Sequence, residues 1–379
     1  MMYMRSTPVL FILCALITAI LLSSAGCLNA PGTLAGILLP GPGPANTFAI
    51  TPVPTGTSFV LIETLPPAAP VVPESPSYQD LVVPPGTSDT VQSEQFTFQY
   101  HGASYSVAVP VNASLYQAAR DSPNKQLNIS GTNDTAAFYR QMMNDPAMDP
   151  FFNGLIREID RDRYAGGNNM SDDDYLEMVT SFVQQIPTMN DTSLTPRYPV
   201  EVIAGGSGTS IEKSMLLSGI LSRQGYNTAF IYFPDLHIAA SGIGVHLATN
   251  NPSFRVFSDG RNDFVYIETT ETRLIGIYDD QVAAAPDPVV IRLGSGTLGY
   301  SHLNFMMDIF TDLRTTEAQL KMLANKAGPS QQLDADDYEA AVSYMNTYNF
   351  VMTTNDRDAA YSMIRASELP HHTACVTCG

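Results

Sequence analysis

Apolar and polar residues alternate along the chain from Phe96 to Val109, apart from a break at His101-Gly102-Ala103. Such alternation is typical of strands that bury one face, because successive side chains of a strand point to opposite sides. A short break that contains glycine is typical of a tight turn. The stretch therefore predicts a β-hairpin.

A helical pattern follows the hairpin, with apolar residues every three or four positions from Tyr175 to Ile186. Ser171 and Asp174 stand at the spacing of a capping box, and Pro187 closes the pattern. Because a capping box satisfies free backbone donors at a helix start, we expect the helix to begin just after Ser171.

A second helix is predicted after a loop of small residues at 204–208. Thr209 and Glu212 form its predicted capping box, and Gly225 marks its end. The expected inward face carries four apolar residues, Leu216, Leu217, Ile220 and Leu221.

Strand patterns come next, at 228–233, 237–247 and 263–269, the last reached from 254–257 across a turn. Helices followed by strands joined through short turns favour an α+β fold with an antiparallel sheet. Helical periodicity returns at 303–323 and around 338–345, so we expect an appended C-terminal helical region.

The first 27 residues have the features of an export signal. Arg5 precedes an apolar run from Val9 to Leu22, and small residues lead into Cys27, as in a lipobox. We expect Cys27 to be lipidated. The alternatives are an uncleaved membrane anchor and simple secretion, although the run is short for a membrane span of roughly 20 residues.

These patterns divide the chain into five parts. The predicted signal peptide, 1–27, is followed by a Pro- and Thr-rich linker, 28–92, which favours an extended stalk. The folded domain is expected at 93–300, the C-terminal helices at 301–370, and a His- and Cys-containing tail at 371–379.

Composition narrows the range of functions. The formal net charge is −18, which argues against nucleic acid as a partner, because phosphate binding needs clustered Lys and Arg. The domain at 93–300 contains no cysteine. No disulfide can therefore stabilise it, and its stability must come from an ordinary hydrophobic core.

Three side chains in this region could form a nucleophile, base and acid: Ser210, His237 and Glu268. Ser210 is predicted at a helix start, where the helix dipole stabilises developing negative charge. His237 and Glu268 are predicted on neighbouring strands, where an imidazole could take a proton and a carboxylate could orient the ring.

The surrounding sequence resembles the transglutaminase-like superfamily, and archaeal exported members in particular. The resemblance lies in Phe182–Pro187, Arg197–Glu201, the small-residue loop and Tyr266–Thr270, and it covers roughly residues 96–278. It implies a papain-like arrangement of the α+β fold. It also implies that Ser210, His237 and Glu268 occupy the family's catalytic positions, with the Gln184 amide in the oxyanion hole.

The chain departs from the family at the reacting residue. The family motif has the form Gly-Asp-Cys-Glu-Asp-x-Ser, whereas this chain reads Gly-Thr-Ser-Ile-Glu-Lys-Ser at 208–214. A hydroxyl is a much weaker acid than a thiol and needs a well-placed base. We therefore expect a non-catalytic domain. The alternative is a serine-dependent peptidase or acyltransferase that uses Ser210, His237 and Glu268.

Two other interpretations concern the same region. His246 is a second candidate for the site histidine. Ser210 and Lys213 also match the S-x-x-K motif of penicillin-binding proteins, but the S-D-N and K-T-G triplets of those families are absent from the sequence.

The C-terminal tail groups four side chains that zinc would accept: His371, His372, Cys375 and Cys378. A disulfide or a free tail are the alternatives, and we assign no metal site and expect no cofactor. The sequence thus predicts a protein on the extracytoplasmic face of the cell membrane that binds envelope proteins or peptides.

Overall fold

The computed structural model describes residues 78–83, 90–126, 132–164, 170–190, 195–245, 255–294, 296–327 and 333–372. Several predicted features lie outside these residues: the signal peptide with Cys27, most of the linker, His246, and the side chains of His371, His372, Cys375 and Cys378.

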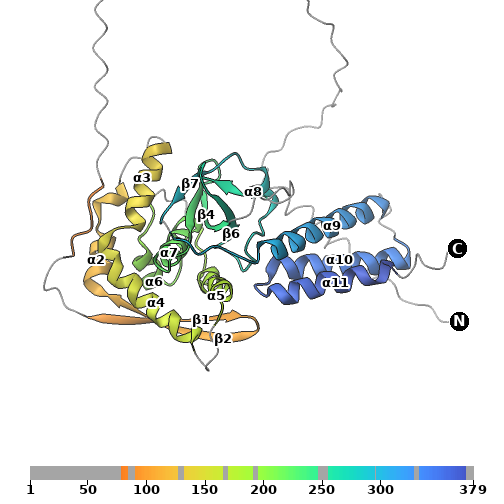
Figure 1. Cartoon of the computed structure of the whole chain (residues 1–379), viewed down its shortest axis with the longest axis horizontal. Coiled ribbons are helices and arrows are strands. Elements are labelled where there is room, and N and C mark those ends of the chain that lie inside the picture. The colour runs from red at the N-terminus through yellow and green to blue at the C-terminus, as the bar shows by residue number, and fades with distance from the viewer. Residues whose placement is uncertain are drawn as a thin grey trace, which may run out of the picture. The chain divides into compact units, whose positions relative to one another are not determined.

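The centre of the fold is a five-stranded antiparallel sheet in the order β5-β6-β4-β3-β7 (Figure 1). The strands are β3 (Thr228–Phe233), β4 (Ile238–Val245), β5 (Phe257–Ser258), β6 (Asp263–Ile267) and β7 (Val289–Arg292). β3 has the predicted bounds, while β4 begins one residue after His237. Together with the helices, this sheet confirms the α+β class.

Helices surround the sheet and supply most of the remaining structure. They are α2 (Ala113–Arg120), α3 (Thr132–Met143), α4 (Asp149–Arg163), α5 (Asp172–Gln184), α6 (Pro199–Gly205), α7 (Ser210–Arg223) and α8 (Asp280–Ala284), with short 3-10 turns at Pro123–Gln126 and Pro146–Met148. α7 contacts β3 and β4 of the sheet and the helices α3, α4, α5 and α6. It is therefore buried from Glu212 to Leu221, including residues that the sequence did not place inward.

The predicted hairpin is confirmed as β1 (Val91–Tyr100) paired with β2 (Ala103–Asn112). His101 and Gly102 make the turn with φ of +46° and +72°. A histidine in this left-handed region is uncommon. Here its ring stacks on Tyr100, with centroids 4.2 Å apart, and its Nε2 lies 3.9 Å from Glu177 of α5.

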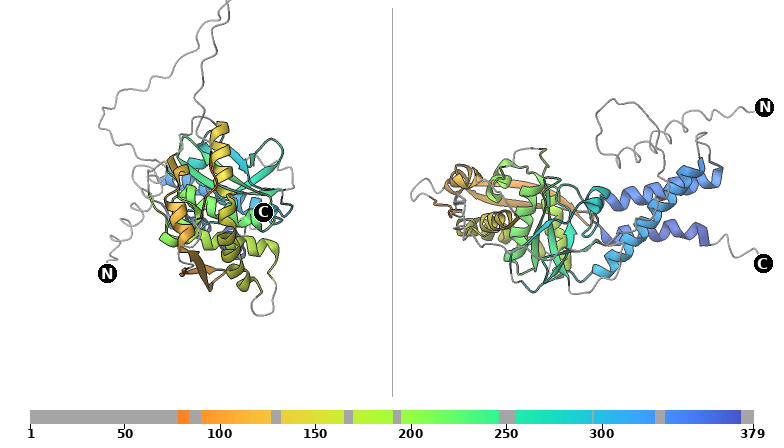
Figure 2. Two further views of the ribbon diagram at one scale, coloured as in Figure 1. Left: turned by 90° about the vertical axis from the view of Figure 1, so that its left-hand side faces the viewer. Right: turned by 90° about the horizontal axis from the view of Figure 1, so that it is seen from above.

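The C-terminal helices α9 (Leu303–Ala327), α10 (Ala335–Thr353) and α11 (Arg357–His372) run side by side in Figures 1 and 2. They are joined to α5 by a buried polar cluster. The Arg357 guanidinium lies 2.5 Å from Glu177, and the Tyr300 hydroxyl donates to the same carboxylate at 2.7 Å. Burial raises the pKa of Glu177, and the nearby charge of Arg357 opposes this.

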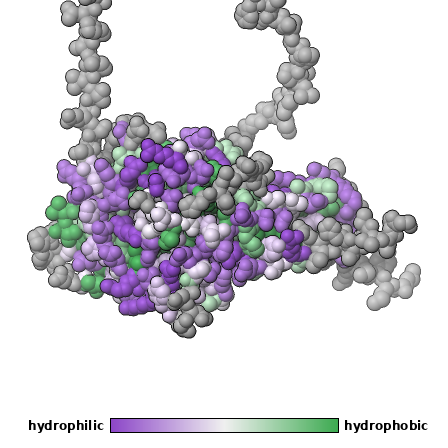
Figure 3. Space-filling view, viewed as in Figure 1, coloured by the Kyte–Doolittle hydropathy of each residue, from purple (hydrophilic) through white to green (hydrophobic). Residues whose placement is uncertain are grey.

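The folded domain begins earlier than the sequence predicted. The predicted linker ended at residue 92, but Tyr78 already donates a hydrogen bond to the buried Asp145 at 2.6 Å, and the Leu81 N–H donates to the same carboxylate at 2.9 Å. Within the part of the chain that the structure describes, no helix has both the length and the apolar composition to cross a membrane. On the face shown in Figure 3, hydrophilic residues cover most of the surface of the described part.

Candidate functional site around Ser210

Ser210 is the first residue of α7, and the capping box predicted before it is confirmed. Thr209 Oγ1 accepts a hydrogen bond from the Glu212 N–H at 3.3 Å, and the Glu212 carboxylate accepts one from the Thr209 N–H at 2.9 Å. Arg197 also pairs with Glu212 at 2.8 Å. The positive end of the α7 dipole thus already faces a carboxylate, which disfavours a second negative charge at the same place.

The Ser210 side chain bonds to the sheet. Its Oγ accepts a hydrogen bond from the Ala239 N–H at 3.3 Å. β4 pairs with β6 only from Ser241 onward, so Ala239 lies beyond the last pair on that side. The Ser210 hydroxyl therefore supplies an acceptor where the neighbouring strand has ended.

The next serines of α7 continue this pattern at intervals of four residues, which places them on one face of the helix. Ser214 Oγ donates to the Ala239 carbonyl at 3.0 Å, and Ser218 Oγ donates to the Ala229 carbonyl at 3.3 Å. Ser218 also shares a hydrogen bond of 2.9 Å with Ser241. We refer to Ser210, Ser214 and Ser218 as the serine face, and it joins α7 to the sheet.

His237 lies in the turn between β3 and β4 rather than inside a strand. Its side chain is exposed, and its backbone is left-handed, with φ of +52°. Its N–H donates to the Pro234 carbonyl at 3.3 Å, which closes the turn. Among the described residues, no hydrogen bond joins the His237 ring to Ser210 or to Glu268.

Gln184 was predicted to stabilise an oxyanion, and the structure gives its amide a different role. The two hydrogens of its Nε2 point to the Glu268 carbonyl at 2.9 Å and the Arg273 carbonyl at 2.8 Å, and its Oε1 accepts from the Arg273 N–H at 3.3 Å. An amide has only two donors. Because both are in use, Gln184 holds the loop after β6 and has none left for an oxyanion.

Glu268 was predicted to orient the histidine, but its carboxylate bonds to its own turn. Oε1 accepts from the Thr269 N–H, the Thr270 N–H and Thr270 Oγ1, at 2.9, 2.8 and 2.6 Å. Oε2 accepts from the Tyr266 hydroxyl at 2.8 Å. Burial and the charge of Glu268 raise the pKa of Tyr266 well above its ordinary value, so Tyr266 remains a donor.

Lys213 is fully buried, three residues after Ser210, and could be taken for the base of an S-x-x-K pair. Its Nζ instead donates to the Gln184 carbonyl at 3.1 Å, the Ile186 carbonyl at 2.6 Å and Thr188 Oγ1 at 3.1 Å. These three bonds use all three ammonium hydrogens. Burial lowers the pKa of Lys213 to about 8, and the side chain fastens the end of α5 to α7.

The turn that holds His237 lies beside a small cavity. This cavity has a volume of about 130 Å³ and is lined by residues 233–236 and 285–287. Pockets that hold small molecules usually have volumes of about 300–1,000 Å³. No group of three or more His, Cys, Asp or Glu side chains in the described ranges is arranged to hold a metal ion.

Patterns in the sequence did not reveal the hydrogen-bond partners that determine the roles of Gln184 and Lys213. The partners of Gln184 lie 84 and 89 residues away in the chain, and those of Lys213 lie 25 to 29 residues away. The spacing of the serines was the one local signal available.

Comparisons of this chain with protein-family models, with curated proteins and with solved structures find no match.

Proposed function

We propose that this chain is a membrane-anchored, extracytoplasmic domain of the transglutaminase-like type that binds envelope proteins or peptides and does not catalyse a reaction. The papain-like arrangement is supported by Ser210 at a helix start facing a strand that follows His237. The observation that carries the loss of catalysis is the use of the Gln184 amide and the Glu268 carboxylate in fixed structural bonds.

Activity assays on the full chain test this proposal. The chain is incubated with amine donors and glutamine-containing peptides, alongside Ser210→Ala and the neighbouring control Ser207→Ala. We expect the same background rate for all three proteins. Turnover that Ser210→Ala abolishes and Ser207→Ala keeps would contradict a non-catalytic role.

The anchor is tested separately by membrane fractionation of the full chain and Cys27→Ala. If Cys27 carries lipid, the variant moves from the membrane fraction to the soluble fraction or is retained as an unprocessed precursor of higher mass. Lipid on Cys27 is then identified by mass spectrometry of the mature N-terminus. A Cys27→Ala protein of unchanged mass and unchanged membrane attachment would contradict lipidation.

A further inference from the structure

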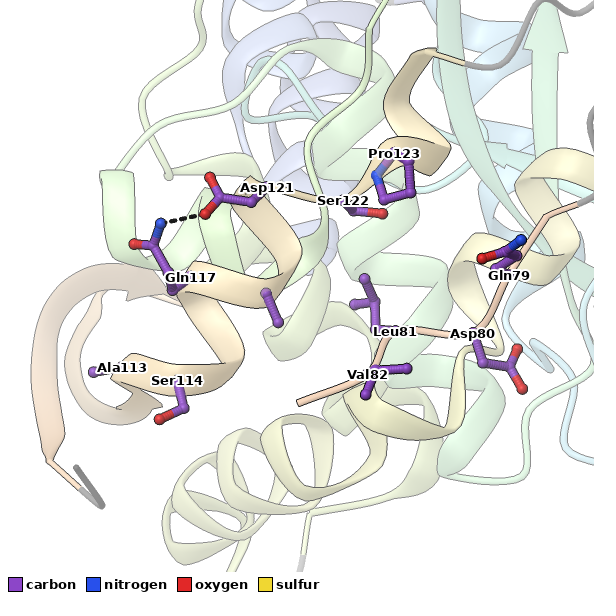
Figure 4. A pocket seen from close by; sticks show the side chains of 11 residues that line it. Gln79, Asp80, Leu81, Val82, Ala113, Ser114, Gln117, Asp121, Ser122 and Pro123 are labelled. Atoms are coloured by element: carbon purple, nitrogen blue, oxygen red, sulfur yellow. Dashed lines mark hydrogen bonds between the residues drawn. The ribbon is translucent and has the colours of Figure 1, made fainter. Parts of the chain in front are cut away.

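A cavity of about 470 Å³ lies between the segment 78–83 and α2, and neither Ser210 nor His237 lines it. In Figure 4, Gln117 and Asp121 stand on one side of this opening, and Leu81 and Val82 stand on the other. The volume is within the range of ligand pockets. Residues 84–89, which connect the segment to β1, lie outside the described residues.

One edge of the segment is bonded to the domain. The Gln79 N–H donates to Asn124 Oδ1 at 3.1 Å, and Asn124 Nδ2 donates back to the Gln79 carbonyl at 2.6 Å. The Leu81 N–H donates to Asp145. Because both backbone groups of Gln79 and the N–H of Leu81 point the same way, the segment is extended and alternates in the manner of a strand.

The opposite edge is unpaired. The backbone groups of Asp80 and Val82 point away from Asn124 and Asp145, and they form no hydrogen bond with any residue that the structure describes. Val82 is 80% exposed. An unpaired extended edge is a template for a further strand.

The charged side chains beside this edge indicate which kind of peptide it would bind. Asp80 and Asp121 both line the cavity, and its described lining includes no Lys or Arg. Asp121 accepts a hydrogen bond from Gln117 at 2.5 Å, and Arg120 Nε lies 3.8 Å from its carboxylate, whereas the Asp80 carboxylate pairs with no residue that the structure describes. Leu81, Val82 and Ala118 supply apolar surface between the two carboxylates. Successive side chains of an added strand point to opposite faces, so basic side chains could contact the carboxylates while apolar ones contact the apolar surface.

We propose that this cavity binds an extended peptide segment that carries lysine or arginine, and that the peptide pairs with the free edge of Asp80 and Val82. The proposal rests on the binding part of the function proposed above and locates it away from Ser210. A catalytic Ser210 would contradict only the non-catalytic part of that proposal, so the two can fail separately.

The test is fluorescence anisotropy of the full chain in detergent micelles, with a labelled peptide of alternating lysine and valine and a matched peptide of alternating glutamate and valine. We expect saturable binding of the lysine peptide only. The double variant Asp80→Asn, Asp121→Asn should weaken binding by roughly two- to thirtyfold, since each exposed charge pair contributes about 0.2–1 kcal/mol. The control Asp235→Asn, Asp287→Asn should bind as the unmodified chain does.

A second variant, Val82→Pro, tests the backbone pairing, because it removes one N–H from the free edge and no described hydrogen bond of the fold. It should weaken binding of the lysine peptide by roughly two- to tenfold, consistent with the net contribution of a single hydrogen bond. Equal binding of the two peptides, no binding of either, or unchanged binding by both variants would overturn the proposal.

Discussion

Ser214 of α7 and Thr269, which follows β6, share a hydrogen bond of 2.9 Å between two fully buried hydroxyl groups. Ser214 also donates to the Ala239 carbonyl at 3.0 Å. The two hydroxyls thus complete the sheet where β4 and β6 no longer pair directly. We infer that the serine face stabilises the fold at the helix start where the sequence predicted a nucleophile.

Replacing Ser214 by Ala should destabilise the protein by about 1–3 kcal/mol, because buried polar groups at Ala239 and Thr269 lose a partner. The matched control is Ser222→Ala, since among the described residues the Ser222 hydroxyl bonds to the Gly219 carbonyl of its own helix and to no other group. The control should stay within about 0.5 kcal/mol of the unmodified chain. Urea denaturation measures both, and equal losses would count against a special role for the serine face.

Lys213 predicts a pH dependence of stability. Its folded pKa of about 8 lies below its ordinary value of 10.5, so between these pH values the unfolded chain holds a proton that the folded chain has released. Lys213 therefore raises the free energy of unfolding as the pH rises from 8 to 10.5, by about 1.4 kcal/mol per pH unit. Below pH 8 the gain is absent.

The comparison is with Lys213→Met, measured by denaturation at several pH values. The difference between the two proteins should grow in favour of Lys213 from pH 8 upward. Tyrosine ionisation in the unfolded state affects both proteins and cancels in the difference. A difference that stays flat or shrinks over this window would show that burial does not depress the pKa of this lysine.

Gly219 should not tolerate alanine, although alanine normally stabilises a helix interior by about 1 kcal/mol. A methyl group there would lie 2.8 Å from Phe152 Cε1 and closer still to Cζ. Overpacking of a close-packed core costs about 1–3 kcal/mol, so Gly219→Ala should be destabilising. The double variant with Phe152→Leu should recover part of the loss, and a gain in stability from Gly219→Ala alone would be the opposite result.

Arg357 should hold the C-terminal helices on the domain. Arg357→Leu leaves the buried Glu177 carboxylate without its 2.5 Å partner, which typically costs 3–5 kcal/mol. Hydrogen exchange should become faster in α9–α11, while α7 keeps its protection. The control Arg365→Leu, at an exposed position of α11, should leave exchange unchanged. Equal exchange rates in both variants would contradict this role for Arg357.

Local signals in the sequence predicted the elements well. The capping box of Thr209 and Glu212, the hairpin turn at His101-Gly102 and the bounds of β3 depend on neighbouring residues, and the structure confirms each. The serine face was not predicted, because serines spaced by four residues suggest a solvated helix face unless a sheet lies against them.

The hydrogen-bond partners of the candidate site residues could not be predicted from the sequence for a related reason. A carboxylate such as Glu268 or an amide such as Gln184 has the right chemistry for the predicted role, but its actual role depends on which hydrogen-bond donors and acceptors surround it in the fold. Glu268 meets Thr269 and Thr270 within its own turn, and Gln184 meets carbonyls of a distant loop. Likewise, the Pro-rich composition before Val91 concealed that Tyr78 bonds to Asp145.

The most direct measurement is covalent labelling of the full chain with a fluorophosphonate, followed by mass spectrometry of the Ser210 peptide. An activated serine reacts because a base removes its proton, whereas Ser210 Oγ is bonded to the Ala239 N–H and to no described base. The account predicts no labelling of Ser210 above that of the half-buried loop serine Ser207. Stoichiometric labelling of Ser210 that is lost in His237→Ala would contradict it.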